Sequence, residues 1–357
     1  MKKRNWIILV CVILYSLFIG YKYQIRNRAS AAGATNELKV VTSFYPMYMH
    51  TKVIMEGTPH ELINMASQTV GCLHDYQLTV QDAKKLYDAD VLIINGLGSE
   101  TFIEKAYKQN KNLKVVDASS EIAKIIEEDE AHIQEVHNHD EHDHEDDHNH
   151  DDHDHEDDHN HNHNHDDHDH NHDDHDHDHI NDHIWLSIKG SIMQIEQIAN
   201  ELIKIDPTYE DVYKENAKAY IAALEELDKV AQQSLLDYEN KKVVSVHDAF
   251  EYLAEDLDIE IIETIPEGSY ENASAKQLET LIDGMKESDA KVILTEARNK
   301  DLAILQMIQK ETDAKIYILD TFVAEAENLD LVEGQAYEYV ARMKKNIETL
   351  SEAFDYE

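Results

Sequence analysis

Histidine and carboxylate side chains, both of them metal-binding groups, crowd one window of the sequence. Between His132 and His183, 52 residues hold 20 His, 21 Asp or Glu and 7 Asn, with no Lys or Arg. This composition cannot bury apolar surface, so it predicts a disordered, cation-binding loop at 132–182. Half of the formal net charge of −42 lies in this window. The acidic chain is unsuited to nucleic acid, which needs a basic surface, and favours cations as partners.

Four side chains with metal-binding groups lie at the expected ends of secondary-structure elements, three of them away from the tract and one, His183, at its end. His74 lies in GCLHDYQLT, between a predicted strand and helix, and His183 lies in NDHIWLS, where the tract rejoins apolar sequence. His247 ends the segment VVSVH, and Asp320 ends IYILD. Loops at the carboxyl ends of parallel strands commonly hold ligands. If the four converge, three imidazoles and one carboxylate would form a tetrahedral zinc site.

Two α/β halves would position these groups, because strand-like and helix-like segments alternate in each. In the first half we expect helices at 47–57, 79–90 and 99–110, and strands at 38–45, 60–66, 91–96 and 114–119. In the second half we expect helices at 248–257, 274–289, 301–313 and 331–354, and strands at 241–247, 259–265, 291–296 and 314–320. Each half is therefore predicted to be a mostly parallel sheet with flanking helices. His50, inside a helix, and His60, at a strand start, are interpreted as structural.

A long helix is expected to join the two halves. Apolar residues recur at helical spacing over 188–205, and no Gly or Pro interrupts 208–239 after Pro207, which suits a helix start with Asp206 as N-cap. Thr79 with Asp82, and Ser274, are the other expected helix caps. The predicted organisation is an N-terminal lobe at 37–206 that contains the His-rich loop, a connecting helix at 207–239 and a C-terminal lobe at 240–357. A cleft between the lobes is the expected ligand site.

The N-terminal segment 1–36 predicts export. Lys2, Lys3 and Arg4 precede an apolar run from 6 to 21, and basic residues follow it. The run is either an uncleaved membrane anchor, which we favour, or a signal peptide cleaved near Ala29-Ser30-Ala31. In both cases the remainder of the chain is expected outside the cytoplasmic membrane, tethered to its outer face or secreted.

Several segments in order resemble the zinc- and manganese-binding solute-binding proteins of ABC transporters. They are GCLHDYQLTVQDAKKLYDADVLIINGLGSE, NDHIWLSI, VVSVHDAFEYLAEDLDI and IPEGSYENASAKQLETLIDGMKESDAKVILTE, and the resemblance covers about 37–357. It implies two α/β lobes joined by a rigid long helix, with metal held between them by His74, His183, His247 and Asp320. A water at the fourth position and a Cys72 thiolate are the alternatives for this site.

The resemblance implies a monomeric carrier that captures Zn²⁺ and delivers it to a cognate ABC permease. Manganese members tend to carry a carboxylate where this chain has His247, and an imidazole-rich site suits zinc, whereas manganese prefers oxygen ligands. No hydrolase or phosphate-loop motif indicates an enzyme. The alternatives are a manganese-binding member of the family and a surface protein for zinc buffering or adhesion, in which the tract alone would carry the function.

Overall fold

The computed structural model describes residues 37–66, 76–108, 110–126, 180–265, 274–325 and 337–355. The N-terminal apolar segment, the His-rich tract as far as residue 179, and the candidates Cys72 and His74 lie outside the described residues. Apart from 124–126 and Ile180, the described residues belong to one compact unit that holds both sheets. Within these ranges no helix has the combination of length and apolarity that crossing a bilayer requires.

The first sheet is parallel, with strand order β2-β1-β3-β4. Its strands are β1 (Lys39–Thr42), β2 (Glu61–Asn64), β3 (Val91–Ile94) and β4 (Lys114–Asp117). The helices of this half are α2 (Tyr45–Ile54), α3 (Val80–Tyr87) and α4 (Thr101–Tyr107). Strand β3, VLII, is buried at every residue, as expected for a central strand covered on both faces.

The second sheet repeats the topology, with the parallel order β6-β5-β7-β8. Its strands are β5 (Lys242–Val246), β6 (Glu260–Ile265), β7 (Val292–Thr295) and β8 (Lys315–Ile318). The flanking helices are α8 (Glu251–Asp256), α9 (Ala275–Ser288) and α10 (Ala303–Thr312), with a short 3-10 helix η4 (Asp248–Phe250) before α8. The predicted α/β class with two mostly parallel sheets is confirmed.

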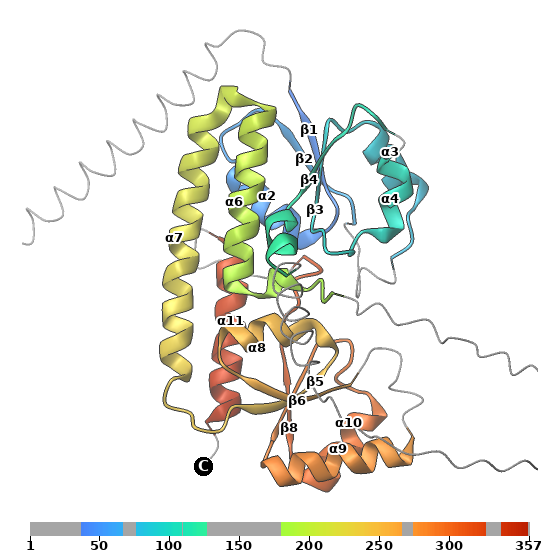
Figure 1. The fold of residues 1–357 in the computed structure, drawn as a ribbon, viewed down its shortest axis with the longest axis vertical. Coiled ribbons are helices and arrows are strands. Elements are labelled where there is room, and N and C mark those ends of the chain that lie inside the picture. Colours follow the sequence, from blue (N-terminus) through green and yellow to red (C-terminus); the bar gives the residue numbers. More distant parts are fainter. Residues whose placement is uncertain are drawn as a thin grey trace, which may run out of the picture. The chain divides into compact units, whose positions relative to one another are not determined.

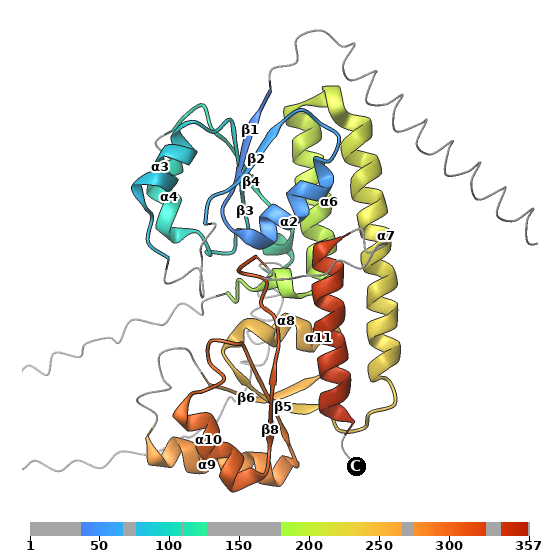
Figure 2. The ribbon, with the colours of Figure 1, turned by 180° about the vertical axis from the view of Figure 1, so that it is seen from behind.

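Three longer helices run beside the sheets (Figures 1 and 2). They are α6 (Ile188–Ile205), α7 (Glu210–Leu235) and α11 (Glu338–Phe354), and α7 packs against α6, α2 and α11. Tyr213, Tyr220 and Leu224 of α7 are fully buried in these contacts. Because its partners come from the first half and from the C-terminal end of the chain, α7 ties distant parts of the sequence together.

The capping predictions at Thr79 and Ser274 are confirmed, whereas Asp206 caps a 3-10 turn ahead of the long helix. The Thr79 hydroxyl accepts from the backbone amide of Asp82, and the Asp82 carboxylate accepts from the backbone amide of Thr79. Ser274 and Gln277 form the same reciprocal capping box. Asp206 accepts from Thr208 ahead of a 3-10 turn, η3 (Pro207–Tyr209).

Several element boundaries differ from the prediction by a few residues, and two of the differences have a clear physical cause. The strand expected at 38–45 ends at Thr42, because Phe44 takes the N-cap position of α2 and Pro46 lies in its first turn. The connecting helix expected over 207–239 begins with the 3-10 turn and is α-helical only from Glu210 to Leu235. Leu235 is its last buried apolar residue, and the next residue, Leu236, is 77% exposed.

His50 and His60 both lie inside the protein and away from the other histidines. His50 Nδ1 is 3.1 Å from the hydroxyl of Tyr220. His60 accepts from the Leu38 amide at 3.2 Å, and its Nε2 is 2.9 Å from Asp206. His50 thus connects helix α2 to α7, and His60 connects the start of β2 to the end of α6. Both histidines therefore have structural roles.

We expect His50 to make the free energy of unfolding fall in acid. Burial lowers its pKa to about 3, whereas an unfolded chain protonates the same ring near 6.5. The unfolded state then binds more protons between these values, so stability is lost as pH falls below about 6.5, by about 1.4 kcal/mol per pH unit. Urea unfolding in the presence of a chelator, at about pH 7 and pH 5.5, should show a smaller acid loss for His50→Gln than for the wild type. An equal loss in both proteins would contradict this origin.

Candidate metal centre

Three side chains that could hold a metal ion converge where the two halves of the chain meet. One ligand atom from each of His183, His247 and Asp248 lies within 4.8 Å of the others. The two imidazole rings meet edge to face, with centroids 4.7 Å apart. The His183 and His247 side chains are only 3% and 7% exposed, whereas Asp248 is 47% exposed. The cluster thus has a buried imidazole pair with a carboxylate on its solvent side.

His183 is oriented by the residues just before it. It directly precedes the 3-10 helix η2 (Ile184–Leu186). The side-chain oxygen of Asn181 accepts from the His183 amide at 3.0 Å and lies 2.9 Å from its Nδ1. An oxygen there requires a proton on Nδ1, which leaves Nε2 with a lone pair for a metal ion.

The segment that carries His183 is held from both sheets. Asn95, after β3, donates to the carbonyl of Asp182 at 2.9 Å. The Tyr252 hydroxyl, from α8, donates to the carbonyl of Asn181 at 2.9 Å. The side-chain nitrogen Nδ2 of Asn181 donates to the carbonyl of Asp248, also at 2.9 Å. Asn181 and Asp182, which the sequence placed in the His-rich loop, are therefore fixed parts of the site.

Trp185 fixes the other side of His183. Its ring centroid lies 5.0 Å from that of His183 and 4.8 Å from that of Phe44, and it is 1% exposed. The indole N–H donates to the carbonyl of Thr321, after β8, at 2.9 Å. One side chain thus joins the first sheet, the His183 turn and the second sheet.

His247 follows β5 and has an unusual backbone. Its φ is +90°, a conformation that side chains other than glycine rarely adopt. The amide donates to the carbonyl of Ile265 at 3.0 Å, and the Ser245 hydroxyl donates to the carbonyl of His247 at 2.6 Å. These bonds hold the strained peptide and turn the imidazole toward His183.

Glu296, which the sequence argument missed, supports the His247 ring. It follows β7, and its Oε1 lies 3.2 Å from His247 Nδ1 and 3.0 Å from the Arg298 guanidinium. Burial acts to raise its pKa, but the bonds from His247 and Arg298 outweigh burial and hold the pKa below its usual value. A charged carboxylate beside Nδ1 orients the ring, and Nε2, which lies 3.1 Å from Asp248 Oδ1, is the ring atom on the side of the cluster. The sequence did contain a feature that could have identified Glu296, because this residue ends a predicted strand, as Asp320 does.

Asp320 lies after β8 but is not part of the group of potential ligands found among the described residues. Its two carboxylate oxygens accept from Nε and Nη2 of Arg342, each at 2.7 Å. The structure therefore brings together two of the four predicted ligands, His183 and His247. It adds Asp248, places Asp320 in an ion pair, and leaves His74 outside the described residues.

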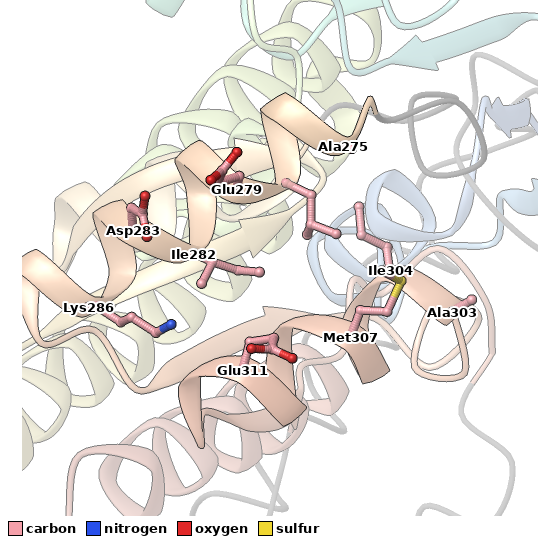
Figure 3. A pocket seen from close by; sticks show the side chains of 10 residues that line it. Ala275, Glu279, Ile282, Asp283, Lys286, Ala303, Ile304, Met307 and Glu311 are labelled. Atoms are coloured by element: carbon pink, nitrogen blue, oxygen red, sulfur yellow. The ribbon is translucent and has the colours of Figure 1, made fainter.

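A groove in the second half offers different chemistry (Figure 3). It lies between α9 and α10 and has a volume of about 590 Å³. Apolar side chains such as Ile282, Ile304 and Met307 line it together with charged ones such as Glu279 and Lys286. No imidazole or thiol is among its lining residues, so we assign metal chemistry to the histidine cluster.

The known proteins that this chain resembles include zinc-binding and zinc-uptake proteins. The family model described as zinc-uptake complex component A, periplasmic, matches residues 40–353. The zinc-binding protein AdcA of Streptococcus pyogenes serotype M3 is 30% identical, over 98% of this chain and 61% of AdcA. The high-affinity zinc uptake system protein ZnuA of Bacillus subtilis is 28% identical, over 92% of this chain and 91% of ZnuA. The chain thus spans less than two thirds of the AdcA relatives and nearly all of ZnuA.

Solved structures share the fold. The Zn(II)-bound ZnuA-like domain of Streptococcus pneumoniae AdcA superposes with a TM-score of 0.63 at 22% identity, covering 90% of this chain and 100% of that domain. FpvC of Pseudomonas aeruginosa, solved with Ni²⁺, gives 0.63 at 23% identity, over 89% of this chain and 97% of FpvC. At these identities the likeness establishes the shared architecture.

Proposed function

Because the chain belongs to the zinc-uptake complex component A family, we propose that it is an extracytoplasmic solute-binding protein that captures Zn²⁺ and delivers it to an ABC permease. The observation that carries the proposal is the meeting of His183 and His247 in a buried, pre-oriented pair. Each ring has an oxygen partner near Nδ1, an arrangement typical of metal-binding histidines. The family supports transport as the role, in preference to catalysis.

The proposed coordination sphere has three imidazoles. His74 would supply the third, because the segment between β2 and α3 that contains it follows the carboxyl end of β2, on the edge of the first sheet. The fourth position would go to the Asp248 carboxylate or to solvent, since Asp320 is bound by Arg342. Three nitrogen donors favour zinc over manganese, which prefers oxygen.

We further propose that the protein acts as a monomer at the outer face of the cytoplasmic membrane. Residues 1–36 would supply the anchor or the cleaved signal, and the His-rich tract would collect zinc near the high-affinity site. Dense but unorganised imidazoles must order a flexible chain to bind, so each tract site should be weaker than the folded site.

Deletion of residues 132–179 tests the proposal directly. The shortened protein should still bind one zinc ion with sub-micromolar affinity, because His183, His247 and His74 remain. Competition titration against a chromophoric chelator measures both stoichiometry and affinity. A full-length control in which the tract histidines are changed to Asn should behave identically at this first site. Loss of all sub-micromolar binding on deletion would place the function in the tract and contradict the proposed site.

A further inference from the structure

Asp320 is held by one helix through its backbone and its side chain. The Asn346 side-chain nitrogen Nδ2 donates to the Asp320 carbonyl at 2.8 Å, and the Asn346 side-chain oxygen accepts from the Asp320 backbone amide at 2.8 Å. One turn earlier on α11, Arg342 grips both carboxylate oxygens. The oxygen Oδ1 also accepts from the amide of Phe322 at 2.8 Å. Three hydrogen bonds, two from Arg342 and one from the Phe322 amide, therefore hold the carboxylate.

Arg342 is itself locked in place. Its side chain is 4% exposed, and its third guanidinium nitrogen donates to Glu338 at 3.2 Å. The guanidinium lies 5.0 Å from the ring centroid of Phe322 and 5.7 Å from that of Tyr45. The Tyr45 hydroxyl, from α2, donates to Glu338 at 2.9 Å. A buried planar fork with bidentate geometry binds a carboxylate far more specifically than a lysine would.

Withdrawal of Asp320 from this fork would be costly. Among the described residues, Arg342 would then keep Glu338 as its one ion-pair partner, in surroundings that exclude most water. Asp320, by contrast, is 39% exposed and faces a cavity of about 550 Å³ that Glu296, Arg342 and Lys345 also line. The Asp320 carboxylate is therefore expected to stay bound to Arg342 and not to move to the buried histidine pair.

We propose that Arg342 is a specificity-determining residue, which holds Asp320 out of the metal coordination sphere and so biases the site against manganese. The inference rests on the proposed zinc site. Asp248 already brings one carboxylate to the histidine pair, and Asp320 would add a second. Each added oxygen ligand makes the site better suited to Mn²⁺, whereas an imidazole-rich site with at most one carboxylate suits Zn²⁺. Arg342 acts through Asp320 and touches no ligand of the ion.

The test compares four full-length proteins: wild type, Arg342→Met, Asp320→Asn and the double variant. All carry the same His-rich tract, so its contribution cancels when the first equivalent of metal is compared. We expect Arg342→Met to raise Mn²⁺ affinity about tenfold and to change Zn²⁺ affinity less than about threefold. The gain for Mn²⁺ should disappear in the double variant. The electron paramagnetic resonance signal of bound Mn²⁺ and a zinc competition titration provide the two readouts.

Asp320→Asn in the wild-type background keeps the inference open to refutation even if Arg342→Met fails to fold. Asp320 is partly exposed and Asn can still accept from Arg342, so zinc affinity should change less than about threefold. A loss of tenfold or more would show that Asp320 ligates zinc despite Arg342, and so overturn the inference. A folded Arg342→Met protein with unchanged Mn²⁺ affinity would overturn it too. Absence of tight zinc binding in the wild type would instead refute the proposed function.

Discussion

His247→Ala is expected to weaken zinc binding by about 100-fold or more, in the protein that lacks residues 132–179. Removal of a partner that merely orients a metal ligand already costs about 10–100-fold, and His247 is proposed as a ligand itself. Alanine keeps the Cβ atom, so the backbone at φ +90° is strained equally in both proteins. The main loss should therefore appear in zinc affinity, and the metal-free free energy of unfolding should fall only by the cost of losing the buried contacts with Glu296 and His183. Competition titration and urea unfolding measure the two quantities.

His50→Gln is the matched control for this variant. It also removes one buried imidazole, but His50 contacts Tyr220 and Tyr339 and lies outside the candidate cluster. At neutral pH its zinc affinity should equal that of the parent protein. If His247→Ala binds zinc as tightly as His50→Gln does, the histidine pair is not the zinc site.

Trp185→Ala should give the largest loss of stability, about 3–5 kcal/mol, the usual cost when a buried aromatic ring is removed. Trp185 is almost fully buried and packs on Phe44 and His183, and its N–H bonds to the Thr321 carbonyl. The cavity would open beside a proposed ligand, so zinc affinity should fall as well. Urea unfolding of the metal-free protein gives the free energy of unfolding.

Trp185→Phe separates packing from hydrogen bonding. Phenylalanine keeps most of the ring contact and loses the bond to Thr321, so we expect a loss of about 1 kcal/mol from the hydrogen bond. A loss as large as that of Trp185→Ala would assign the stability to the Thr321 bond, and no loss in either variant would contradict the packing account.

Local sequence patterns predicted most of the fold. The run of VLII predicts a buried strand at β3, and the Thr79–Asp82 pair predicts where α3 begins. The boundary at β1 failed because TSFY continues an apolar, strand-like pattern past Thr42, and only the Pro46 turn shows where α2 takes over. Element type thus follows from local periodicity, whereas ends depend on caps that compete with it.

The site was less accessible to sequence reasoning, because its contacts join distant segments. His183 and His247 could be selected as histidines at element ends. The ion pair between Arg342 and Asp320 could not be predicted, because it joins a strand end to a helical residue 22 positions later. At sequence level Arg342 pairs as readily with Glu338, four residues before it on α11. Only the packing of α11 against β8 decides that Arg342 also takes Asp320.

The strained backbone at His247 would make the lifetime of the protein depend on its proposed ligand, zinc. A side chain held at φ +90° carries about 1–3 kcal/mol of strain, so the empty protein is less stable than its fold would allow. A bound ion compensates, because a ligand present at 1,000 times its Kd adds about 4 kcal/mol to the native state. Proteases act on transiently opened chains, so the empty form would be degraded faster than the loaded one. The abundance of the carrier would then follow the supply of its metal without any change in its synthesis.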